Sequence, residues 1–205
     1  MIEPTRRLTK DAMTRPLFEP LSEEHERPDE WSGPLGFVIG GFARPVMQAE
    51  REGALAEQYF EAATALVDAI LDKRVADYQV ANAALFLYRH SFELLLKAGL
   101  PPEVREGKNI HHLANLAKSY AHHKGQEGHV VPPWVIKRCE ELAAIDPGSV
   151  AFRYGDYGTP TAEDGSPIFD EIHVDLHHLK EAMRALNMVL VKQNWLIRMA
   201  RGDRP

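Results

Sequence analysis

The sequence predicts an all-α protein, an up-and-down bundle of four to five helices. Apolar residues recur at spacings of three and four along several long stretches, as they do on the buried face of an amphipathic helix. Most connections between these stretches are short, which favours antiparallel neighbours in a bundle. A chain of 205 residues is long enough to bury a full core in one domain.

The first two predicted helices cover residues 48–72 and 77–99. One face of the first helix is predicted to carry the apolar residues Leu55, Tyr59, Ala63, Leu66 and Ile70. The second helix has Asp77 as its expected N-cap and Gly99 as its stop. Its middle, residues 83–88, is apolar on every side, so we expect other helices to surround it.

Three further helices are predicted over residues 110–123, 133–145 and 175–201. Pro133 suits a first helical turn, and Asp175 suits an N-cap. Residues 146–173 are rich in Gly, Pro, Asp and Tyr, and they are expected to form a long irregular loop before the last helix. Loops of this length in compact domains are often functional.

Residues 1–46 are predicted to form an irregular N-terminal arm, and residues 47–205 the helical domain. Prolines recur through the arm and interrupt any helix periodicity. Its apolar segment, residues 35–42, is expected to be extended and docked on the body. The glycines of this segment do not match a phosphate-binding loop.

The composition argues against several classes of protein. The net charge is -6, whereas proteins that coat nucleic acid usually carry an excess of basic residues. A single cysteine, Cys139, cannot form an internal disulfide. No apolar run approaches the roughly 20 residues of a membrane span, and no signal peptide is recognised. We therefore expect a cytoplasmic chain without membrane contact.

The helix over residues 77–99 carries a row of polar residues. At about 100° per residue, Asn82, Arg89 and Glu93 lie within about 40° of each other, and Lys97 extends the row. Two interpretations remain open: a solvated face with helix ion pairs worth about 0.2–0.5 kcal/mol each, or a semi-buried network. A buried arginine would have to be paired, because an unpaired buried charge is very costly.

The ten histidines do not predict a metal site. His111 and His122 return to one helix face, but they lie about 16 Å apart along it and cannot share a zinc ion. His173 and His177 have a usable spacing, but His173 precedes the expected helix start at Asp175. No metal and no cofactor is therefore predicted.

An aromatic and basic triplet, Phe152-Arg153-Tyr154, lies in the predicted loop. Aromatic rings beside an arginine are suited to stacking on bases or to holding a phosphate. In the alternative that we favour, the aromatic rings anchor the loop and Arg153 pairs with a helix carboxylate such as Glu93.

Three of these segments together resemble motifs of the HEPN-like family. Residues 89–98, RHSFELLLKA, resemble its arginine–glutamate–lysine helix. Residues 109–116, NIHHLANL, are similar to the His-x-Leu-x-x-Leu helix that follows it. The Phe152-Arg153-Tyr154 triplet looks like the Phe-Arg-Tyr-Pro stretch of one bacterial branch, with Gly155 in place of the proline. The resemblance covers residues 50–200, and residues 1–46 fall outside it.

The resemblance implies a bundle of four or five helices that is often a homodimer. Many members of the family are RNases or components of toxin–antitoxin and antiphage defence systems, while others bind nucleotides or act only as interaction modules. Members that cut RNA carry an Arg-x4-6-His motif across a helix start. Arg105 and His111 have that spacing, but they precede the third helix, whereas the family places its site near the last helices.

These observations favour a non-catalytic HEPN-like protein that acts through a protein partner or a phosphate-bearing partner, RNA or nucleotide. Its binding site or core polar network would comprise Asn82, Arg89, Glu93, Lys97, His111, Arg153 and Tyr154. The alternative is a metal-independent HEPN ribonuclease that uses Arg105 and His111. A metal-dependent enzyme built on the histidines is the least favoured hypothesis.

The last predicted helix has two apolar stripes, whereas a bundle helix needs only one. The first stripe comprises Leu179, Met183, Leu186, Leu190 and Ile197, and the second comprises Met188, Trp195 and Met199. The second stripe requires a cover, since large exposed apolar patches usually mark interfaces. We expect a second copy of the chain in a two-fold dimer, with the N-terminal arm as the alternative cover.

Overall fold

A computed structural model describes residues 48–105, 111–146, 148–154 and 173–200. The elements are α2 (Gln48–Leu71), α3 (Asp77–Ala98), a 3-10 turn (Pro102–Val104), α4 (Leu113–Gln126), α5 (Pro133–Ile145), α6 (Ala151–Tyr154) and α7 (Leu176–Ala200). No strand occurs in these ranges, so the predicted all-α class is confirmed for the described residues. The predicted N-terminal arm lies outside them.

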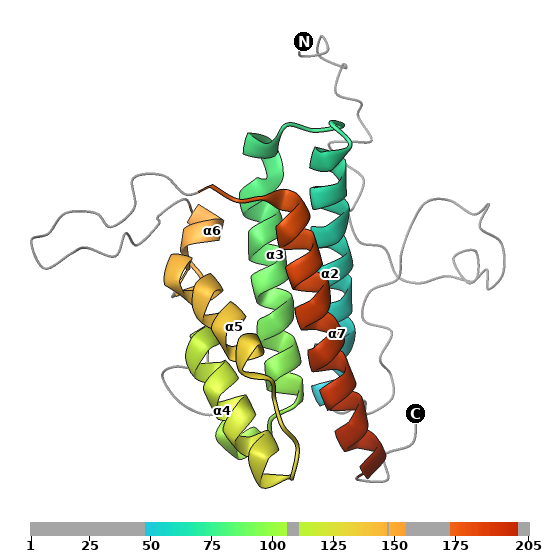
Figure 1. Ribbon diagram of the computed structural model, residues 1–205, viewed down its shortest axis with the longest axis vertical. Coiled ribbons are helices and arrows are strands. Elements are labelled where there is room, and N and C mark those ends of the chain that lie inside the picture. The colour runs from blue at the N-terminus through green and yellow to red at the C-terminus, as the bar shows by residue number, and fades with distance from the viewer. Residues whose placement is uncertain (1–47, 106–110, 147, 155–172, 201–205) are drawn as a thin grey trace, which may run out of the picture. The chain divides into compact units, whose positions relative to one another are not determined.

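Helix α3 is the element around which the others are arranged (Figure 1). It packs against α2 along most of its length, and it also contacts α4, α6 and α7. Helices α4 and α5 form a second pair that lies beside α3. Tyr88, Phe92 and Leu96 of α3 are fully buried, as expected for a helix with neighbours on several sides. Within the described ranges, no helix is long and apolar enough to cross a membrane.

The face of α2 that packs into the core differs from the predicted face. The residues buried on it are Ala56, Phe60, Ala63, Thr64, Val67 and Ala69. Of the predicted face, Ala63 belongs to this set and Leu66 packs against the core from a half-buried position, whereas Leu55 is exposed. The predicted face was wrong by about one residue of rotation, because the spacing of apolar residues is compatible with two adjacent faces of the helix. Ala56 and Ala63 are fully buried, and small side chains at such positions let two helices approach closely.

The start of α3 also differs from the prediction, by one residue. Ala76 is the N-cap, so Asp77 is the first helical residue and the prediction of Asp77 as N-cap was wrong. The Asp77 carboxylate accepts a hydrogen bond from the N–H of Tyr78 at 2.7 Å. Its charge at the first turn is still favourable, because the N-terminal end of a helix carries partial positive charge.

The caps of α4 and α7 explain where these helices begin. His112 is the N-cap of α4, and its ring accepts a hydrogen bond from the N–H of Asn115, so α4 begins later than predicted. Asp175 accepts hydrogen bonds from the N–H groups of His177 and His178 at 2.9 and 3.1 Å. The predicted start of the last helix at Asp175 is therefore confirmed to within one residue.

The short helix α6 lies inside the segment that was predicted to be an irregular loop. It covers only four residues, Ala151–Tyr154. A single turn is too short to show hydrophobic periodicity, so the sequence pattern could not indicate it. Residues 155–172, which make up most of that predicted loop, lie outside the described ranges.

The C-terminal end of α3 is held close to α4 and α7. The hydroxyl of Tyr120 donates to Asn194 Oδ1 at 2.8 Å, and the Asn194 amide donates to the carbonyl of Leu95 at 2.9 Å. At Gly99 the backbone lies directly against side chains of α4 and α7, because a Cβ atom there would overlap both Asn194 and Tyr120. The glycine is thus required by close packing.

We predict that Gly99→Ala lowers the free energy of unfolding by about 1–3 kcal/mol, the usual effect of overpacking a core. Gly53→Ala is the matched control, because no heavy atom lies within 4 Å of a Cβ placed at this helical glycine. It should raise the free energy of unfolding by about 0.5–1 kcal/mol. Chemical denaturation of both variants tests the pair, and equal effects of the two substitutions would contradict the packing argument.

Candidate functional site

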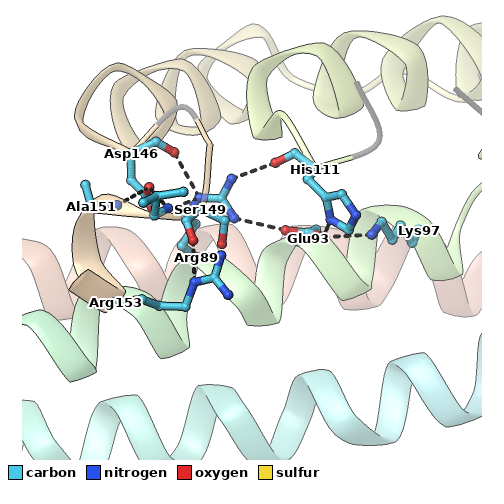
Figure 2. Close-up of polar contacts among 9 residues, drawn as sticks. Arg89, Glu93, Lys97, His111, Asp146, Ser149, Ala151 and Arg153 are labelled. Carbon is cyan, nitrogen blue, oxygen red and sulfur yellow. Dashed lines mark hydrogen bonds and ion pairs between the residues drawn. The ribbon is translucent and has the colours of Figure 1, made fainter. Parts of the chain in front are cut away.

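The side chain of Arg89 on α3 is completely buried, and every nitrogen of its guanidinium has a partner (Figure 2). Nη1 donates to Glu93 Oε2 at 2.9 Å, and Nη2 donates to the carbonyl of His111 at 2.6 Å. Nε donates to the carbonyl of Asp146 at 3.2 Å and lies 3.3 Å from its carboxylate. One cation therefore joins α3, the start of α4 and the end of α5.

Glu93 is the second centre of this network. Its Oε1 accepts a hydrogen bond from Lys97 Nζ at 2.7 Å and lies 2.7 Å from His111 Nδ1. Burial by itself would raise the pKa of this carboxyl, but the hydrogen bonds from Lys97 and His111 and the charge of Arg89 outweigh it. The pKa of Glu93 is therefore lowered, and the group is ionised at neutral pH.

His111 connects the buried network to the surface. Its carbonyl lies in the core, bound by Arg89, whereas 65% of its side chain is exposed. An ionised carboxylate can only accept hydrogen bonds, so the contact with Glu93 assigns the ring proton to Nδ1. The lone pair of the neutral ring then lies on Nε2.

Asp146 completes the network, and it was not among the site residues predicted from the sequence. Its Oδ1 accepts hydrogen bonds from the N–H groups of Val150 and Ala151 at 2.6 and 2.9 Å, which fixes the start of α6. The carboxylate is fully buried beside Arg89. In the sequence, only its position a few residues before a helix start could have indicated the role of Asp146, because aspartate is favoured at such capping positions.

The structure thus brings together four of the predicted residues, Arg89, Glu93, Lys97 and His111. Arg153 lies at the edge of this set, where it donates to the carbonyl of Ser149 and lies over the Phe86 ring at 5.7 Å. Phe152 is buried, which agrees with an anchoring role. Asn82 is exposed, two turns before Arg89, and the side chain of Tyr154 lies outside the described residues.

A small aromatic cluster lies next to the network. The His90 ring stacks on Phe86 with a centroid distance of 5.7 Å and meets the edge of Tyr59 at 4.8 Å. Burial lowers the pKa of His90, and this effect outweighs the opposing charge of Glu93. The neutral ring therefore packs as an aromatic side chain at neutral pH.

Arg105, the arginine of the alternative ribonuclease site, is engaged elsewhere. Its Nη1 donates to Glu52 Oε2 at 2.7 Å, and its Nε donates to the carbonyl of Leu100 at 2.7 Å. Both members of the Arg105–Glu52 pair are only 12% exposed. These contacts tie the connection after α3 to α2, and they engage the Nε and Nη1 donors of Arg105.

The described residues contain no group of three histidine, cysteine, aspartate or glutamate side chains arranged to hold a metal ion. Cys139 is buried on α5, and burial raises the pKa of its thiol to about 12. A thiol with so high a pKa is a poor nucleophile. Comparison with protein-family models, curated proteins and solved structures gives no match, so the site is interpreted from its own geometry.

We predict that Arg89→Ala lowers the free energy of unfolding by about 3 kcal/mol or more, because the buried carboxylate of Asp146 would lose the cation beside it and Glu93 would lose one of its two cationic partners. Arg74→Ala removes an exposed ion pair with Asp72 and is the matched control, with an expected effect of at most about 0.5 kcal/mol. Urea denaturation of both variants measures the difference. A loss below about 0.5 kcal/mol for Arg89→Ala would contradict a structural role for the network.

Proposed function

We propose that this chain is a non-catalytic HEPN-like helical protein that acts through a protein partner or a phosphate-bearing partner in a bacterial defence, toxin-associated or regulatory system. One observation carries the non-catalytic part of this proposal. Arg89, the first charged residue of the HEPN-like motif, is fully buried, and all its nitrogens are bound within the chain.

A catalytic or ligand-binding arginine has to present at least one donor to its substrate. Arg89 cannot do so, because its side chain is 0% exposed and each of its three nitrogens already donates to Glu93 or to the carbonyl of Asp146 or His111. Lys97 is also directed at Glu93, at 2.7 Å. These charges therefore stabilise the positions of α3, α4 and α5 relative to each other, which is the role expected of a buried and fully paired network.

The alternative, a metal-independent ribonuclease with Arg105 and His111, requires both side chains at one cleft. Arg105 would first have to break its contacts with Glu52 and with the Leu100 carbonyl. Removing one partner of a largely buried pair leaves the other charge uncompensated, which opposes such a rearrangement. The geometry therefore favours the non-catalytic hypothesis.

We predict that the purified full chain does not cleave single-stranded or structured RNA above background when divalent metals are chelated. The wild type and the His111→Ala variant should give the same RNA profile on denaturing gels. Since a trace contaminant also cleaves RNA, the comparison between the two proteins is the informative measurement. Cleavage by the wild type that disappears in both His111→Ala and Arg105→Ala would establish the ribonuclease alternative.

The surface of α7 is the part of the chain that we assign to self-association. Met183, Leu186 and Leu190 of its first stripe are buried in the core. On another side of the helix, Met188, Val191 and Trp195 are 67%, 47% and 55% exposed, at spacings of three and four residues. Such an exposed apolar row is suited to a protein interface. A homodimer through this row is our proposal for the first partner.

We predict that the full chain is a dimer in solution and that Trp195→Glu makes it a monomer. A charge in the middle of an apolar interface would have to be desolvated without a partner, which weakens association. Tyr78→Glu is the matched control, because Tyr78 is an exposed aromatic residue in the first turn of α3 and does not belong to the α7 row. Light scattering on the three proteins measures the mass. A monomeric wild type, or a Trp195→Glu variant that remains dimeric, would contradict this assignment.

A further inference from the structure

One chemically reactive atom at the network has no structural role among the described residues. His111 Nδ1 is held by Glu93, but no described residue makes a hydrogen bond with the other ring nitrogen, Nε2. The side chain is 65% exposed, so reagents in solution can reach the ring. A neutral imidazole with its proton fixed on Nδ1 presents the Nε2 lone pair to such a reagent.

The groups around His111 are arranged as they are around an activated nucleophile. In such sites a base or carboxylate orients the nucleophile, and a third group in turn orients that carboxylate. Here Glu93 orients the imidazole, and the Glu93 carboxylate is itself fixed by Arg89 at 2.9 Å and by Lys97 at 2.7 Å. A carboxylate that accepts from Nδ1–H fixes the tautomer and the orientation of the ring, as it does for histidines that bind metals, and this keeps the lone pair on Nε2.

The charge near the ring favours an anionic reagent. Within the network Arg89 is balanced by Glu93 and by the buried carboxylate of Asp146, and Lys97 is the cation that is closer to the surface. Lys97 Nζ binds the same carboxylate oxygen of Glu93 as His111 Nδ1, so its positive charge lies near the ring and attracts a negatively charged reagent from solution. A phosphoryl group has three oxygens that carry such charge.

We infer that His111 Nε2 is a phosphoryl-acceptor site that reacts with a small, free acyl phosphate. The lone pair of Nε2 forms a bond to phosphorus, the phosphorus–oxygen bond to the acyl group breaks, and the carboxylate leaves with that electron pair. The ring becomes an imidazolium, whose Nδ1–H still donates to Glu93. No oxidant, reductant or metal takes part, and the site is independent of the dimer and of the missing ribonuclease activity proposed above.

The test uses the full chain and acetyl phosphate at mildly alkaline pH, where phosphohistidine is stable. Peptide mass spectrometry without acid steps locates the added group, and ³¹P NMR identifies a phosphorus–nitrogen bond. His122 is the control within the same chain, because it is exposed on α4 and its described contact is with Gln126. We expect His111 to be phosphorylated at least about tenfold faster than His122, within the range of an oriented, activated group.

Two variants separate activation from simple exposure. His111→Gln should abolish the fast labelling, and His122→Gln should leave it unchanged. Glu93→Gln keeps the shape of the side chain but removes its charge, so it should bring labelling of His111 down to the rate of His122. If this variant does not fold, as circular dichroism would show, the comparison of His111 with His122 in the wild type decides. Equal labelling of the two histidines, acetylation in place of phosphorylation, or no labelling of His111 would overturn the inference.

Discussion

The structure depends on the burial of one positive charge, the guanidinium of Arg89. A cation away from water is stable only with its hydrogen-bonding groups satisfied and its charge balanced, and a single helix cannot supply all of this. Glu93 comes from the same helix, but the remaining acceptors come from the segment before α4 and from the end of α5. The arginine therefore requires these two segments to occupy defined positions beside α3.

A second polar contact fixes the C-terminal end of α3. The Asn194 side chain accepts from Tyr120 of α4 and donates to the Leu95 carbonyl of α3, next to the tight approach at Gly99. Arg89 and Gly99 are ten residues apart, about 15 Å along a helix. Between the two contacts α3 also contributes apolar side chains such as Phe92 and Leu96 to the core. Apolar contacts have no preferred direction, so the polar contacts at Arg89 and near Gly99 specify the register of the helices.

The sequence predicted the helical architecture better than it predicted the contacts between helices. Caps and stops such as Asp175 and Pro133 act locally, so their positions could be recognised in the chain. The buried face of α2 was missed because periodicity alone does not say which of two adjacent faces meets a neighbour. Asn82 was grouped with Arg89 because the two residues lie at similar angles around the helix. Their exposure differs, since it depends on which turns of α3 are covered by other helices, and this is set by the tertiary structure. Asp146 was missed for the same reason, since it is 57 residues from Arg89 in the chain.

The same geometry explains how a structural network can end in a reactive group. The backbone of His111 is part of the core, because its carbonyl accepts from Arg89, and its ring is at the surface. Glu93 contacts both Arg89 and the His111 ring, so the negative charge that balances the core also orients the exposed imidazole. Any change in the charge of that ring alters the field at Glu93, and the effect reaches Arg89 through a contact of 2.9 Å. The surface state of His111 and the packing of α4 and α5 on α3 are therefore coupled by two adjacent hydrogen bonds.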